Sequence, residues 1–388
     1  MSKPGFFSRL GRGITVLRTF IVNTAFVLVM VVVLAALFGG EERISVPENS
    51  ALLLDPAGEL VEQVKLPDSW EELLFIDGAV GQTAVADVER AISLAASDTN
   101  IRMLVLNLDD LFAASHAQAQ RVGAALTSFK ESGKSVIAYG TSFSQLQYHI
   151  ASHADKVYMH PMGQLLLTGL GGSRLFFKDA LDKLDVQVHV FRVGDYKSAT
   201  EPYTRSNMSD EARQDSQRLV DGIWSQVTAD IALNRGLSEA QLSQFSNFFP
   251  DALEAVGGDM AQAAMQANLV DGLMTMDEIR DEVAAQVGWQ DDALNSIDYR
   301  SYLLVNSGSD KVSQDDAQVA VVKLIGPIFD YAADDTGIAS AEQISALIDD
   351  ARKDARIHAL VLRVDSPGGT PYGSELIRDA LAGFQATG

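Results

Sequence analysis

The chain repeats part of its own sequence, and this repeat limits the possible folds more than any other feature. Residues 101–109, IRMLVLNLD, match residues 357–365, IHALVLRVD, at an offset of 256 positions. Residues 125–133 match 380–388 at an offset of 255, so the spacing changes by a single residue along the repeat. Chance similarity between two α/β units would not preserve the spacing so closely, and we interpret the chain as a tandem duplication.

Both copies are predicted to alternate strands and helices. Each repeated segment is a short apolar run typical of a buried parallel strand, with helical patterns before and after it. Further strands are predicted at 51–55, 319–323, 135–139 and 156–159, and a helix near 145–151. Gly388, the last residue given, corresponds to Gly133 of the first copy, so the second copy lacks everything that follows Gly133 in the first. A half-built copy would expose an apolar sheet edge, so we expect the natural protein to continue.

The region between the copies is predicted to be mainly helical. Ser209 and Ser238 are good helix starts, the latter as part of a capping box, and helical patterns also cover 260–268 and 276–287. The expected organisation is a basic segment (1–19), an apolar segment (20–38), a first copy (51–205), a helical region (206–305), a linker (306–316) and an incomplete second copy (317–388).

Residues 20–38 are predicted to form a transmembrane anchor. They carry no charge, and these 19 residues would span roughly 28 Å as a helix, close to the hydrocarbon thickness of a bilayer. Basic residues precede the segment, and Glu41 and Glu42 follow it. This distribution predicts a single-pass protein whose N-terminus is cytoplasmic and whose remaining chain lies in the periplasm or outside the cell. A cleaved signal peptide is the alternative, but its apolar core is usually only about 7–15 residues long.

Charge and composition exclude several classes of function. Residues 1–40 hold four basic and no acidic side chains, so the remainder carries 26 basic against 52 acidic ones and would repel nucleic acid. The chain has no cysteine, which excludes disulfides, thiolate metal sites and a Cys nucleophile. His149 and His153 share a helical spacing, but without an H-E-x-x-H motif they form at most half a zinc site. We therefore predict no metal and no other cofactor.

A glycine turn follows the repeated strand of the second copy. The sequence Asp365-Ser-Pro-Gly-Gly369 could present the N–H groups of Gly368 and Gly369 to an oxyanion, because glycine lets the backbone approach a ligand closely. An ordinary Pro-Gly turn is the alternative. The first copy has Asp109-Asp-Leu at this place, so only the second copy has the glycines.

A second motif contains a candidate catalytic lysine. Residues 192–205, RVGDYKSATEPYTR, follow a predicted strand at 186–191 and hold Lys197 among small and aromatic residues. A lysine acts as a general base only where desolvation or nearby positive charge lowers its pKa. From the residues alone, a lysine in a loop is more often a solvated cation.

Together these motifs resemble a known family. The Lys197 segment is close to the FRVGxYKSAxEP signature of the long-form bacterial signal peptide peptidases (protease IV, or SppA), and residues 362–369, LRVDSPGG, are close to the LRVNSPGG of that family. The resemblance covers essentially the whole chain. It implies an α/β fold of tandem ClpP/crotonase-like repeats, built from ββα units.

The resemblance also implies an activity. Lys197 would be the general base of a Ser/Lys dyad, Gly368 and Gly369 would line the oxyanion hole, and the Ser nucleophile would lie beyond Gly388. The implied protein is a serine endopeptidase of the bacterial inner membrane, a homo-oligomer that degrades cleaved signal peptides and other short apolar peptides. Residues 1–388 alone are expected to be inactive.

The repeat marks the place of the missing nucleophile. Its equivalent in the first copy is Gln145, which cannot attack a carbonyl, and Ser142 and Ser144 nearby are weak substitutes.

Two alternative functions remain for the protein: a crotonase-like acyl-CoA enzyme, which would also use a glycine-rich oxyanion turn, and a non-enzymatic membrane scaffold.

Overall fold

The computed structural model describes residues 18–31, 45–64, 81–307, 317–331 and 337–386. The chain divides into two compact units, residues 1–45 and 46–388. In the first unit, residues 18–31 form a helix, so only part of the predicted anchor at 20–38 lies within the described residues. Most of the basic segment 1–19 and of the linker 306–316 lies outside them. Among the described residues, no helix combines the length and apolar composition needed to cross a membrane.

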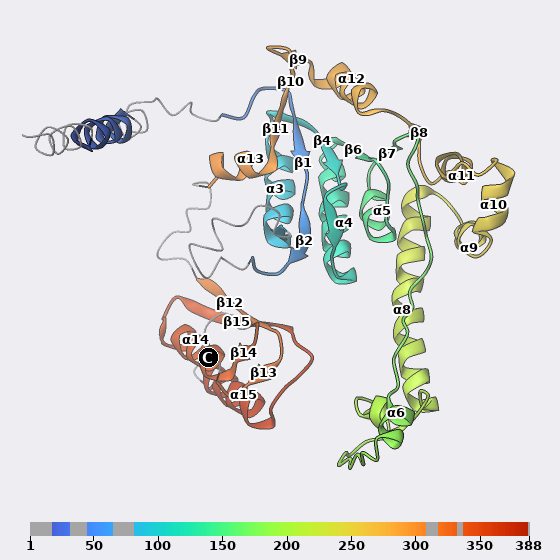
Figure 1. Cartoon of the computed structure of the whole chain (residues 1–388). Helices are drawn as coiled ribbons and strands as arrows, with labels where there is room; N and C mark the ends of the chain where they lie inside the picture. Colours follow the sequence, from blue (N-terminus) through green and yellow to red (C-terminus); the bar gives the residue numbers. More distant parts are fainter. Residues whose placement is uncertain (1–17, 32–44, 65–80, 308–316, 332–336, 387–388) are drawn as a thin grey trace, which may run out of the picture. The chain divides into compact units, whose positions relative to one another are not determined.

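The first copy is built on a sheet of six parallel strands (Figure 1). Their order is β11-β1-β4-β6-β7-β8. Their bounds are β1 (Ser50–Leu54), β4 (Ile101–Asn107), β6 (Ser135–Gly140), β7 (Lys156–Met159), β8 (Gly272–Leu273) and β11 (Ser296–Asp298). The four predicted strands of the first copy are confirmed as β1, β4, β6 and β7. The two outermost strands, β8 and β11, come from the region that was predicted to be mainly helical.

Side chains of the sheet alternate between two covered faces. Leu52 and Leu104 pack into the core with helices α3 (Val85–Ser97), α4 (His116–Glu131) and α5 (Gln145–Ala151). Their neighbours Ala51 and Met103 belong to a second cluster, which α12 (Met276–Val287) covers. A parallel sheet with helices on both faces is the usual arrangement for such apolar strands. A small parallel sheet, β2 (Gly58–Val61), β3 (Gln82–Ala84) and β5 (Leu111–Ala113), completes the copy.

After β7, the structure confirms the predicted helix starts of the helical region and corrects one strand of the first copy. Ser209 and Ser238 are the N-caps of α8 (Asp210–Arg235) and α9 (Glu239–Asn247). The remaining elements are α6 (Lys178–Lys183), α7 (Glu201–Thr204), α10 (Phe249–Ala255), α11 (Met260–Gln266), α13 (Tyr299–Val305), β9 (Trp289–Gln290) and β10 (Ala293–Leu294). The strand predicted at 186–191 is wrong: this segment has no strand partner among the described residues, and Phe191 is 98% exposed.

The second copy repeats the frame of the first. Its elements are β12 (Gln318–Ile325), β13 (Ile328–Phe329), β14 (Ala339–Ser340), α14 (Ala341–Lys353), β15 (Ile357–Asp365) and α15 (Pro371–Gln385). α14 matches α3 residue for residue at the offset of 256. β12 pairs in parallel with β15 as β1 does with β4, and both ladders shift register directly after their first pair. A shared irregularity at one place supports a common origin of the copies.

Within the described residues, only one face of the second copy is covered. Val322, Leu324 and Ile348 form its core. On β12, Val319 and Val321 are 59% and 58% exposed, on the side that α12 covers in the first copy.

Candidate active site

The glycine turn of the second copy lies between β15 and α15. Ile328 donates its N–H to the Gly368 carbonyl at 3.0 Å, and the Thr370 N–H donates to the Ile328 carbonyl at 2.9 Å. Between these bonds, the exposed Gly369 has an N–H without an acceptor among the described residues. A Cβ at Gly369 would lie 1.9 Å from the Ile328 oxygen, so only glycine fits here.

The two predicted oxyanion donors differ in the structure. Gly368 has a φ of +100°, a conformation that favours glycine, and its N–H donates to Ser366 Oγ at 3.1 Å. Within the described residues, the Gly369 N–H is therefore available to a ligand as it stands, whereas the Gly368 N–H becomes available only if the Ser366 hydroxyl moves away.

The equivalent turn of the first copy is closed. The Asp109 carboxylate accepts the N–H of Thr141 at 2.6 Å and its hydroxyl at 2.8 Å. The Gln147 amide donates to the carbonyls of Leu108 and Leu111, both at 2.7 Å, and Leu111 is fully buried. The N–H groups of Asp109 and Leu111 are engaged as well, donating to Asn107 Oδ1 and to the Leu108 carbonyl, both at 3.0 Å.

The position that the repeat predicts for a nucleophile also has structural contacts in the first copy. Gln145 begins α5, and its side-chain oxygen accepts the Gly169 N–H at 3.0 Å. Ser142 Oγ accepts the N–H of Gln164, and Ser144 is the N-cap of α5. All three side chains therefore have structural contacts.

Lys197 lies in an irregular loop before α7, and its side chain is exposed. Arg192 Nη1 donates to the Lys197 carbonyl at 2.6 Å. Within the part of the chain that the structure describes, the Lys197 ammonium has no hydrogen-bond or ion-pair partner and makes no contact with Gly368 or Gly369. The structure thus does not bring the predicted base and the predicted oxyanion donors together.

Sequence reasoning missed Glu201, which belongs to the same loop motif. Its side chain is buried although it carries a carboxylate, and it accepts hydrogen bonds from both the N–H and the hydroxyl of Ser209. The available signal was the position of Ser209 as an N-cap with Ala212 three residues later, since alanine cannot complete a capping box.

Three of the six histidines pack together: His116 at the start of α4, His149 on α5 and His153 just after α5. His149 Nε2 lies 3.2 Å from Asp230 Oδ2, and His116 stacks on His149 with ring centroids 5.4 Å apart. Burial lowers the pKa of His149 despite Asp230, and burial together with His149 lowers the pKa of His153 to about 4. No group of three or more potential metal ligands occurs among the described residues.

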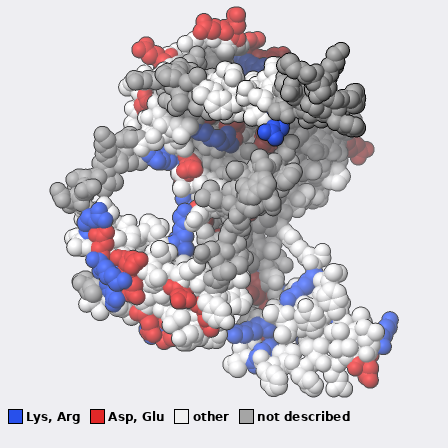
Figure 2. All heavy atoms as spheres, turned by 60° about the vertical axis from the view of Figure 1, so that its left-hand side comes forward, with Lys and Arg blue, Asp and Glu red and all other residues white. Residues whose placement is uncertain are grey.

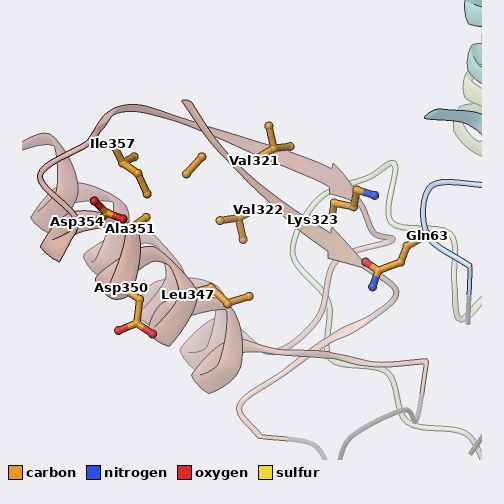
Figure 3. A pocket seen from close by; sticks show the side chains of 10 residues that line it. Gln63, Val321, Val322, Lys323, Leu347, Asp350, Ala351, Asp354 and Ile357 are labelled. Carbon is orange, nitrogen blue, oxygen red and sulfur yellow. The ribbon is translucent and has the colours of Figure 1, made fainter. Parts of the chain in front are cut away.

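A cavity of about 650 Å³ lies between β12 and α14 (Figure 3), and its lining includes none of Lys197, Gly368 and Gly369. Leu347, Ala351 and Asp354 of α14 and the turn after it line one side. In the first copy, β11 pairs with the corresponding edge of β1, and Tyr302 of α13 donates to Asp98 at 3.0 Å. Asp98 matches Asp354, so the cavity corresponds to space that β11 and α13 fill in the first copy.

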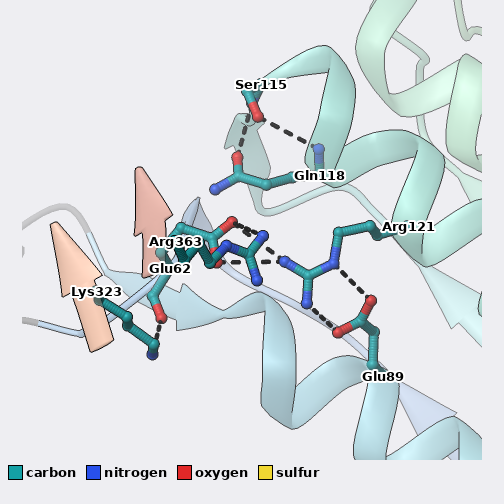
Figure 4. Close-up of polar contacts among 7 residues, drawn as sticks. All are labelled: Glu62, Glu89, Ser115, Gln118, Arg121, Lys323 and Arg363. Carbon is teal, nitrogen blue, oxygen red and sulfur yellow. Dashed lines mark hydrogen bonds and ion pairs between the residues drawn. The ribbon is translucent and has the colours of Figure 1, made fainter. Parts of the chain in front are cut away.

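Charged side chains join the two copies (Figure 4). Glu62 accepts hydrogen bonds from Arg363 of β15 at 2.8 Å and from Arg121 of α4 at 3.2 Å, and its carbonyl accepts from Lys323 of β12 at 2.6 Å. Arg121 also pairs with Glu89. These contacts hold β15 at Arg363, shortly before the glycine turn.

Figure 2 shows acidic and basic side chains interspersed on one face of the molecule.

Comparisons with known proteins agree on one family. Residues 128–290 match the model of peptidase family S49. Protease 4 of Salmonella typhi is 34% identical over 400 aligned positions, which cover 99% of this chain and 63% of that protein. Protease 4 of Haemophilus influenzae is 32% identical, with 95% and 60% covered. The chain thus spans about three-fifths of the length of these curated relatives.

Solved structures show a weaker likeness. The protein named 1510-N membrane-bound stomatin-specific protease S97A mutant matches 64% of this chain and 98% of its own chain, at 9% identity and a TM-score of 0.36. This likeness is too low to define the fold.

Proposed function

We propose that the full-length protein is a serine-type peptidase of family S49, whose model matches residues 128–290, with Lys197 as its general base. The observation that carries the proposal is the Gly369 N–H, which is exposed at the carboxyl end of a parallel strand and bonded to none of the described residues. A fixed backbone donor of this kind stabilises the oxyanion of a tetrahedral intermediate, by about 3–4 kcal/mol for one good donor.

The proposed reaction is acyl transfer to a serine and then to water. Neutral Lys197 takes the proton of the serine hydroxyl as its oxygen attacks the peptide carbonyl, and the Gly369 N–H holds the oxyanion that forms. When the intermediate collapses, the C–N bond breaks and Lys197 returns the proton to the leaving amine. Water then hydrolyses the acyl-enzyme by the same route. We place the serine in the continuation of the full-length chain, at the repeat position that Gln145 occupies in the first copy.

The proposal requires that Lys197 be covered in the active protein. A lysine is neutral near pH 7 only where desolvation or positive charge favours its neutral form, and Lys197 is exposed in the structure. Its neighbours Phe191 and Val193 are 98% and 88% exposed and would suit an apolar cover. The part of the protein that brings the serine, or another protomer of a homo-oligomer, would supply this cover.

We also propose the setting in which the enzyme works. The uncharged run 20–38, preceded by basic residues, would anchor the protein in the inner membrane with its catalytic part in the periplasm. Its substrates would then be cleaved signal peptides and other short apolar peptides released at that membrane.

Replacing Lys197 tests the proposal directly. In the full-length protein, Lys197→Ala should lower kcat for an apolar peptide roughly 10²- to 10⁴-fold, the usual contribution of general acid–base catalysis. Lys183→Ala removes another exposed lysine of the same region and should keep the wild-type rate. A Lys197→Ala enzyme with undiminished kcat would exclude the proposed base. Hydrolysis of a thioester without hydrolysis of the peptide would favour the acyl-CoA alternative.

A further inference from the structure

The first turn of α8 takes one of its capping groups from outside the helix. Ser209 is the N-cap, and its Oγ accepts the Ala212 N–H at 3.1 Å. In a capping box, the side chain of the third helical residue accepts the N–H of the N-cap. That residue is Ala212 here, which has no acceptor. Glu201 takes its place: its carboxylate accepts the Ser209 N–H at 3.1 Å and also the Ser209 hydroxyl.

Helix α12 makes the same pair of bonds within itself. Its N-cap Thr275 donates its N–H and its hydroxyl to Glu278, at 2.7 and 2.9 Å, and Glu278 is the third residue of that helix. The Glu278 side chain is exposed, whereas Glu201 and Ser209 are 3% and 4% exposed. A buried carboxylate that loses such partners is left unsatisfied, so the contact at α8 is much harder to break than the one at α12.

The external carboxylate belongs to the loop of the candidate base. Glu201 lies four residues after Lys197, and its N–H donates to the Ser198 carbonyl at 3.0 Å. Before the lysine, Arg192 holds the Lys197 carbonyl at 2.6 Å. The backbone around Lys197 is therefore fixed on both sides, and on the Glu201 side it is fastened to the start of α8.

We propose that Glu201 is a positioning residue for Lys197 and that Ser209 is the anchor through which it acts. The inference rests on the proposed role of Lys197 as general base. A glutamate at position 212 would cap α8 equally well, as Glu278 caps α12, but it would leave the lysine loop unattached. A general base must stay within hydrogen-bond reach of the proton it takes, and a displacement of about 1 Å can cost roughly 100-fold in rate.

The experiment compares two matched pairs of variants in the full-length protein, with an apolar peptide as substrate. Glu201→Gln and Ser209→Ala alter the contact at α8, and Glu278→Gln and Thr275→Ala alter the same bonds at α12. We expect the α8 variants to lower kcat roughly 10- to 100-fold with KM nearly unchanged, because a misplaced base impairs the chemical step. The α12 variants should keep the wild-type kcat, and Ser209→Thr, which retains the hydroxyl, should restore most of the activity lost in Ser209→Ala.

The outcomes separate this inference from the proposed function. If Lys197→Ala is inactive while Glu201→Gln and Ser209→Ala keep the wild-type kcat, the positioning role is wrong and the base remains. Equal losses in the two pairs would likewise overturn it. Retained activity in Lys197→Ala would instead remove the proposed function. The double variant Glu201→Gln/Ser209→Ala should lose about as much activity as the more impaired of the two single variants, because both changes act on one contact. Losses that add up in the double variant would contradict the proposed contact.

Discussion

The two copies share one frame but use the end of the repeated strand differently. In the first copy, Asp109 and Gln147 bind the polar groups that follow β4, and Leu111 is buried there. In the second copy, the same place after β15 holds Gly369, exposed and with a free N–H within the described structure. One copy uses its strand end to stabilise its own fold, whereas the other leaves a donor open.

The copies also differ in how completely they are packed. Leu104 of β4 is fully buried between covered faces, whereas the equivalent Leu360 of β15 is only partly buried. The first copy has α12 and β11 to cover its sheet, and the second copy has no counterpart of them among the described residues. The packing difference makes a direct prediction for stability.

Removing the matched leucines should give the largest contrast. In the 388-residue chain, Leu104→Ala should lower the free energy of unfolding by about 2–5 kcal/mol, because it leaves a cavity in a closed core. Leu360→Ala should cost about 1–2 kcal/mol, since less apolar surface is buried there. Urea unfolding followed by circular dichroism measures both. Equal losses would show that the two copies are packed alike.

Replacing Gln147 should show how much the closed turn stabilises the first copy. Gln147→Ala leaves the carbonyls of Leu108 and Leu111 without this donor and should cost about 1–3 kcal/mol in unfolding free energy. Gln241 has the same capping-box position in α9 but is exposed, so Gln241→Ala should cost only about 0.5–1 kcal/mol. A Gln147→Ala protein no less stable than Gln241→Ala would mean that the turn closes without its amide.

Acid should destabilise the first copy through His153, a smaller effect. Burial and His149 lower the pKa of His153 from 6.5 to about 4, so between these values the unfolded chain binds a proton that the folded chain does not. The stabilisation is therefore present above pH 6.5 and is lost as the pH falls from 6.5 towards 4. We expect about 1 kcal/mol of loss between pH 7 and pH 5, reduced from the full shift because His153 is partly exposed.

The control for this effect is an exposed histidine. His153→Asn should flatten the pH dependence of urea unfolding between pH 7 and pH 5, whereas His189→Asn, at an exposed position, should leave it unchanged. An unaltered slope in His153→Asn would assign the acid sensitivity to other groups.

Much of the frame could be predicted because its signals are local. The apolar run at 101–109 is β4, the helical pattern at 276–287 is α12, and the capping box at Ser238 begins α9. The errors involve segments whose structure depends on distant partners. β8 and β11 have only two and three residues and exist because β7 and β1 offer free edges to them. The run at 186–191 has the composition of a strand, but no described strand lies beside it to pair with it.

The candidate site shows the same limit. The glycines at 368 and 369 could be predicted from the sequence because a required backbone conformation is written in the residue type. The sequence could not predict that the Gly369 N–H is open and the Gly368 N–H is engaged, because these states depend on contacts with Ile328 and Ser366. Glu201 was missed because the incomplete capping box at Ser209 shows that an acceptor is absent from the helix but does not show which distant residue supplies it.

Because α8 is long, a small change of angle at one end displaces the other end by a larger distance. Its 26 residues correspond to about 39 Å, and most of its first half is exposed, whereas the half near its C-terminus is seated on the first copy through Asp230, Asn234 and Arg235 (Figure 1). A tilt of only about 3° at that seat would swing the far end, to which Glu201 fastens the lysine loop, by roughly 2 Å. Substitutions at the few side chains that seat this end would therefore be expected to shift the opposite tip by ångströms.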